Sequence, residues 1–109
     1  MLAVARRFAG AYMPYQIGRL TRWVRGAIEQ TCTGTFARYL LAHRAQLAPS
    51  LAAHPQDIET YRVASVSLVP GDDTVEVSYV SEQDSADTGA FVVTLTSQHG
   101  RWRVAGLEA

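Results

Sequence analysis

The sequence contains no lysine, and all ten of its basic side chains are arginine. We interpret this bias as codon usage in a GC-rich genome and not as a binding chemistry. Ten acidic residues balance the arginines, which argues against a histone-like or polyacidic protein. The single cysteine, Cys32, excludes an internal disulfide, and no cysteine or histidine cluster has the spacing of a zinc site. We therefore expect no metal and no cofactor.

Long apolar runs are also missing. No stretch approaches the roughly 18 residues that span a bilayer, and the first seven residues lack the basic-then-apolar order of a signal peptide. The chain has 109 residues, of which 48% are hydrophobic and 18% charged. These values are typical of one soluble globular domain, expected over residues 1–109, that buries a core without disulfides.

The charges are unevenly distributed along the chain. Residues 1–50 hold seven arginines and one acidic residue, whereas residues 51–109 hold three arginines and nine acidic residues. Either the two halves attract each other across a packed interface, or they present opposite charges to partners. A third interpretation is that the arginines only solvate the outer faces of helices.

Helical periodicity dominates the first half, and it predicts three helices within about residues 2–48. Apolar residues recur at three- and four-residue steps up to Met13, where Pro14 is expected to end the first helix. A second amphipathic helix is expected to include Ile17 and Leu20 and to end near Thr31. Threonines of the segment 31–35 are candidate N-caps of the third helix.

The second half has the two-residue period of strands, from about residue 58 to 108. Val75 and Val77 alternate with polar neighbours, and turns are predicted at residues 70–73 and at His99 and Gly100. Helices followed by strands indicate an α+β fold, with three N-terminal helices packed on one face of a four-stranded antiparallel sheet.

Three segments carry a resemblance to a known superfamily: residues 5–12, residues 33–36 and residues 100–107. With them, the chain resembles the nuclear transport factor 2-like superfamily, in which helices pack against a curved sheet to form a cone. Within it, the sequence looks most like the extracytoplasmic domains of conjugative-transfer and type IV secretion scaffold proteins. This resemblance implies a bacterial protein-interaction domain, extracytoplasmic behind a membrane segment that this chain does not contain, or otherwise cytoplasmic.

The same superfamily also contains isomerases and dehydratases that place a carboxylate base inside the cone. Most acidic residues of this chain lie in or next to turns, where they are expected to be exposed. Asp57 and Glu59 are the only ones expected near a cone mouth, and we assign no catalytic residue. His43, His54 and His99 are too scattered for a metal site, and Cys32 is expected to be a buried small residue.

Aromatic residues are the candidates for a small apolar cavity, which could accept a small apolar ligand. The alternative is that they simply form the core. The cavity candidates are Phe8, Tyr12, Tyr15, Tyr39, Phe91 and Trp102.

Tyr61, Val80 and Val92 fall out of phase with the main apolar rows of their strands. Apolar residues on both faces of a sheet covered by helices on one side predict a partner, and we expect self-association through the open face. A β-bulge that shifts the phase is the competing explanation.

Arg19, Arg22 and Arg25 recur every three residues around Trp23. Such a row suits an anionic partner, either nucleic acid or lipid headgroups. Nucleic acid is disfavoured because the pI is about 6.8.

These patterns predict a non-catalytic protein-interaction or scaffold domain, and the resemblance implies that it belongs to a conjugative-transfer or secretion assembly. The alternative is a small-molecule-binding protein or an isomerase- or dehydratase-like enzyme that uses the cone cavity.

Overall fold

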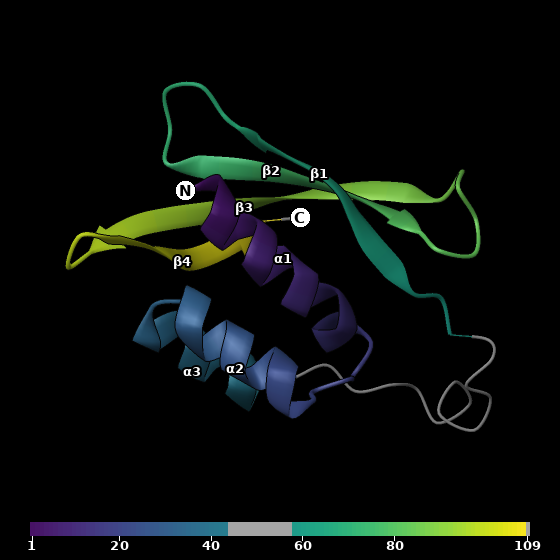
Figure 1. Cartoon of the computed structure of the whole chain (residues 1–109), viewed down its shortest axis with the longest axis horizontal. Helices are drawn as coiled ribbons and strands as arrows, with labels where there is room; N and C mark the ends of the chain where they lie inside the picture. Colours follow the sequence, from purple (N-terminus) through teal and green to yellow (C-terminus); the bar gives the residue numbers. More distant parts are fainter. Residues whose placement is uncertain (44–57, 109) are drawn as a thin grey trace.

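The computed structural model describes residues 1–43 and 58–108, which form three helices followed by a four-stranded antiparallel sheet (Figure 1). The elements are α1 (Leu2–Gln16), α2 (Arg22–Thr31), α3 (Gly34–Ala42), β1 (Tyr61–Leu68), β2 (Thr74–Ser81), β3 (Thr88–Gln98) and β4 (Arg101–Glu108). Neighbouring strands in the sequence are also neighbours in the sheet. The predicted α+β arrangement is confirmed. The end of the third predicted helix, over residues 44–48, lies outside the described residues.

The first helix is longer than predicted. Pro14 lies inside α1, which continues to Gln16. The prediction that the helix ends at Met13 is wrong, because a proline in the last turn removes only its own N–H from the helical hydrogen bonds. The helix ends one turn later, where the N–H of Ile17 donates to the carbonyl of Pro14 at 3.2 Å.

Threonine side chains cap the other two helices. The hydroxyl of Thr21 accepts a hydrogen bond from the N–H of Val24 at 3.2 Å, so α2 begins at Arg22. Ile17 and Leu20, which were expected on this helix, precede it. Thr33 caps α3 in the same way, because its hydroxyl accepts from the third residue after it at 3.2 Å.

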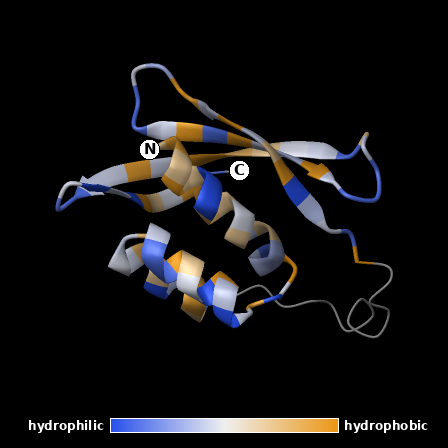
Figure 2. Cartoon of the chain, viewed as in Figure 1, coloured by the Kyte–Doolittle hydropathy of each residue, from blue (hydrophilic) through white to orange (hydrophobic). Residues whose placement is uncertain are grey.

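The core lies between the helices and one face of the sheet. The helix α1 packs against α2 and β1, while α2 and α3 also reach β4 (Figure 1). Figure 2 shows hydrophobic and hydrophilic positions alternating along the strands, as a sheet with one buried face requires. The largest fully buried side chains are Phe8, Ile28, Val24, Val75, Val77, Val93 and Val104.

The short connection between α2 and α3 is fixed to the edge of the sheet. Cys32 forms a parallel β-bridge with Val104 of β4, and the N–H of Thr33 donates to the carbonyl of Val104 at 2.8 Å. These contacts cover part of the β4 edge and bring the end of α2 beside the β3–β4 hairpin.

A β-bulge in β1 changes which side chains face the helices. Val63 pairs with Tyr79 and Ser65 with Ser78, so Ala64 is an extra residue in the ladder. Because of this shift, Val63 on one side of the bulge and Val66 on the other both pack against the core. The competing explanation for the mixed phase of this strand is confirmed for β1.

The ring of Tyr79 lies across Gly89, its direct partner on β3, and occupies the space that a Cβ at Gly89 would need. The same ring packs edge-on against Tyr61, with centroids 5.4 Å apart. We expect Gly89→Ala to displace it and lower the free energy of unfolding by about 1–3 kcal/mol, measured by urea denaturation. The control is Gly26→Ala in α2, where nothing lies within 4 Å of the new carbon. This change should stabilise the protein by up to about 1 kcal/mol, and equal effects at the two glycines would contradict the close packing.

Candidate functional site

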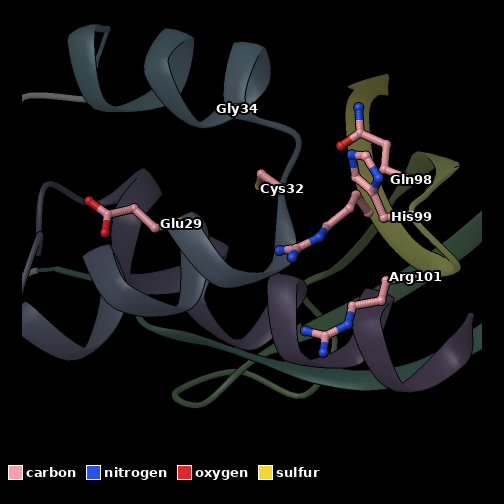
Figure 3. A pocket seen from close by; sticks show the side chains of 7 residues that line it. Glu29, Cys32, Gly34, Gln98, His99 and Arg101 are labelled. Atoms are coloured by element: carbon pink, nitrogen blue, oxygen red, sulfur yellow. The ribbon is translucent and has the colours of Figure 1, made fainter.

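A hollow of about 550 Å³ lies between the helical layer and the tip of the β3–β4 hairpin (Figure 3). It begins where α2 ends and α3 starts, and its opposite wall is the hairpin. We call it the helix–hairpin hollow. Its lining residues are Glu29, Cys32, Gly34, Gln98, His99, Arg101 and Arg103.

The hairpin turn sets the position of the two arginines. His99 and Gly100 have φ values of 53° and 77°, so a two-residue turn joins the strands and pairs Gln98 with Arg101. Residues two apart on a strand share a side, which puts Arg101 and Arg103 together. On the opposite wall, the bridge between the α2–α3 connection and β4 holds the helices in place.

The charged side chains on the two walls of the hollow have different partners. Arg103 donates through Nη1 to the backbone carbonyl of Gln30, near the end of α2. Glu29 pairs with Arg25 one turn earlier, with Nε and Oε1 3.3 Å apart, and this is the ion pair found among the described residues. In Figure 3 the carboxylate of Glu29 points away from the hairpin. The lining is therefore cationic on the hairpin side, while its acidic group is already neutralised.

Cys32 forms part of the wall but is not a reactive thiol. Its side chain is 3% exposed, and burial raises its pKa to about 11. A hydrogen bond with Thr31 and the positive charge of Arg103 oppose this rise. The cation near this thiol is therefore Arg103 of β4, and a thiol with this pKa is protonated at neutral pH.

The acidic residues that the structure describes are exposed, except for the half-buried Asp87. Asp57 lies outside the described residues, and Glu59 is on the surface. The hydroxyl of Tyr61 lies 2.8 Å from a carboxylate oxygen of Glu59 and 3.0 Å from one of Asp87. These hydrogen bonds, with Glu59 as the larger contribution, raise the pKa of Tyr61. The cluster joins the start of β1 to the β2–β3 connection.

The aromatic candidates differ in how deeply they are buried. Phe8, Tyr15 and Phe91 are buried, while Tyr12 and Trp102 are half-buried against the core. The hydroxyl of Tyr15 donates to the carbonyl of Leu40 at 2.7 Å, which satisfies it inside the protein. By contrast, the sixth candidate, Tyr39, is 56% exposed.

None of these six side chains lines the helix–hairpin hollow. None lines a smaller hollow of about 130 Å³, which is bordered by Met13, Pro14, Ile17, Arg19, Thr60, Tyr61 and Glu82.

The described histidines, His43 and His99, lie in different parts of the fold. His43 stacks on Tyr39 at the end of α3, with ring centroids 4.5 Å apart, and His99 is in the hairpin turn. His54 lies outside the described residues. Across residues 1–43 and 58–108, no group of three or more histidine, cysteine or acidic side chains could hold a metal ion.

The predicted arginine row is not continuous on one helix. Arg19 lies in the connection before α2, because the helix begins only after the Thr21 cap. Arg22 and Arg25 are exposed on α2, beside Trp23, which is 59% exposed. Arg25 is also engaged by Glu29.

The three sheet-face candidates occupy different environments. Tyr61 packs against the core on the helix side, so its expected place on the open face is wrong; the bulge at Ala64 is the cause. Val80 and Val92 alternate with core-facing residues and therefore project from the other face. Val80 is 9% exposed and Val92 is half-buried.

Sequence reasoning had not identified the helix–hairpin hollow as a site. Its one visible signal is the pair Arg101 and Arg103, which directly follows a predicted tight turn and must share one side of the strand. Nothing in the sequence indicates that Cys32 and Gly34 lie opposite them.

Among the described helices, none is both long and apolar enough to cross a membrane. A search with models of protein families found no match to this sequence, and a search of curated proteins found none either.

Proposed function

We propose that this chain is a non-catalytic protein-interaction domain that associates with a second copy through the open face of its sheet. The observation that carries the proposal is the position of Val92, which is half-buried, whereas Val80 on the same face is only 9% exposed. Both valines project from the face opposite the core, which no described helix covers. Apolar positions on such a face favour a protein partner.

The charges of this face suit a second copy of the same surface. Val92 lies in register between Glu76 and Glu108, and Val80 lies in register with Arg62. A two-fold axis repeats the same surface on both partners. Arg62 of one copy can then meet the acidic side chains of the other, while the valines lie between these pairs.

The filled core supports an interaction domain over the alternative of an enzyme or small-molecule carrier that uses a cone cavity. Phe8 and Phe91 are 0% and 5% exposed and occupy the space between helices and sheet. The described acidic residues are exposed except for the half-buried Asp87, and none is buried in the dry environment that raises the pKa of a catalytic acid.

The resemblance to scaffold domains of conjugative-transfer and secretion systems extends this proposal to the cellular setting. Scaffold domains in such assemblies work through protein contacts, as the open sheet face would. In that setting, the sheet-face contact would join subunits of an envelope-spanning assembly.

The mass in solution tests the sheet-face contact. We expect the original protein to have the mass of a dimer by light scattering, and Val92→Arg to have that of a monomer, because the long charged side chain would hold the two sheet faces apart. The matched control is Ala3→Arg, which replaces an exposed apolar residue of α1 and should leave the dimer intact. A monomeric original protein, or a dimer that persists in Val92→Arg, would contradict the proposal.

A further inference from the structure

The helix–hairpin hollow has an excess of positive charge that no carboxylate of the described residues balances. Arg101 and Arg103 line it, and no acidic side chain of the described residues lies within ion-pair distance of either. The one acidic lining residue, Glu29, pairs with Arg25 and points away from the hairpin (Figure 3). An anion that enters the hollow therefore meets no unpaired carboxylate among the lining residues.

Arg103 is held in place before any ligand binds. Its Nη1 donates to the carbonyl of Gln30, which fixes the guanidinium beside the end of α2. A guanidinium has five N–H donors, and this contact uses one nitrogen only. The remaining donors are available to a ligand, and their fixed orientation lowers the entropy lost on binding.

A third arginine, Arg38, lies on α3 one turn after Gly34. A carbon placed on Gly34 would be 3.4 Å from Nη1 of Arg38, so this guanidinium folds back over the residue that lines the hollow. Gly34 lines the hollow and has no side chain to occupy it. Arg101 and Arg103 thus line the hollow, and Arg38 lies next to another of its lining residues.

We propose that the helix–hairpin hollow binds a small molecule that carries a phosphate group, with Arg101 and Arg103 holding the phosphate. Guanidinium groups match phosphate oxygens with two parallel hydrogen bonds. Two arginines line the hollow, and its one carboxylate is already paired. A phosphate with two negative charges balances these arginines better than a ligand carboxylate with one. The volume of about 550 Å³ lies within the usual range of small-molecule sites and leaves room for an organic part beside the phosphate.

Titrations of the 109-residue protein with inorganic phosphate and with phenyl phosphate test this proposal. In ¹H–¹⁵N NMR spectra, we expect saturable shifts of the amides of Gly34, Gly100 and Arg101. Sodium chloride at matched ionic strength should not reproduce them, because screening alone has no preferred site.

Arg101→Gln should weaken phosphate binding about tenfold or more, as expected for the loss of one charge-assisted hydrogen bond. Arg103→Gln should have a similar effect, and its amide spectrum shows whether the fold is kept despite the lost contact with Gln30. Arg6→Gln, at an exposed arginine of α1 that does not line the hollow, is the matched control and should bind phosphate as the original protein does.

Absence of saturable shifts at the hollow would overturn the proposal. Equal weakening by Arg101→Gln and Arg6→Gln would also overturn it, because it would show general attraction to a charged surface.

Discussion

Replacing Phe8 with alanine should lower the free energy of unfolding by about 3–5 kcal/mol. The ring is 0% exposed and stacks on Tyr12 with centroids 5.5 Å apart, and it also approaches Phe36 at 6.1 Å. Its removal leaves a cavity between α1, α3 and the sheet, which rigid neighbours fill only in part. Domains of this size have a total stability of about 5–15 kcal/mol, so the variant is expected to be partly unfolded at mild urea concentrations, measured by circular dichroism.

Tyr39→Ala is the matched control for the loss of an aromatic ring. This ring is 56% exposed, although it stacks on Phe36 and on His43. We expect its removal to cost less than about 1 kcal/mol. A similar loss of stability in the two variants would show that Phe8 is not the centre of the core.

The thiol of Cys32 should react with iodoacetamide about a hundredfold more slowly in the folded protein than in the urea-unfolded chain at pH 8. Burial raises its pKa from 9.0 to about 11, and two pKa units change the thiolate fraction about a hundredfold. The rate can be followed by mass spectrometry, and it belongs to this residue because the chain has a single cysteine. Equal rates in the folded and unfolded states would contradict the burial of Cys32.

The same pKa difference predicts how stability depends on pH. Below about pH 9 the thiol is protonated in both the folded and the unfolded state. Its full contribution to the free energy of unfolding is then present. Between pH 9 and about 11 the unfolded chain loses this proton while the folded protein keeps it, so the free energy of unfolding falls as the pH rises. Burial also raises the pKa of Tyr12 and of Tyr15, which add to this loss. The difference between the original protein and Cys32→Ala isolates the thiol.

The class of fold was predictable because its signals are local. Alternation at Val75 and Val77 follows from the two-residue period of a strand, and the turn at His99 and Gly100 from residue types that accept a positive φ. The threonine cap of α3 also needs only the residues next to it. Each of these features depends on a few neighbouring residues, so the sequence contains what is needed to predict it.

Two predictions, the face of Tyr61 and the end of the first helix, were wrong because they depend on more than neighbouring residues. An extra residue at Ala64 moves Tyr61 to the helix side, and whether a strand bulges depends on the partner strand with which it pairs. Pro14 is tolerated in α1 because it stands in the last turn, a position that depends on where the helix ends. Rules about single residues could not settle either point.

The amino-acid order alone was enough for the succession of helices and strands, for the absence of an internal disulfide and for the opposite charges of the two halves. The helix–hairpin hollow depended on packing, because it exists only where the α2–α3 connection meets β4 through Cys32 and Val104. Contacts between distant parts of a chain form when apolar surface is buried, and burial depends on the whole arrangement of elements. For this reason Arg101 and Arg103 could be placed on one side of a strand from their spacing, while the wall opposite them could be found only in the folded protein.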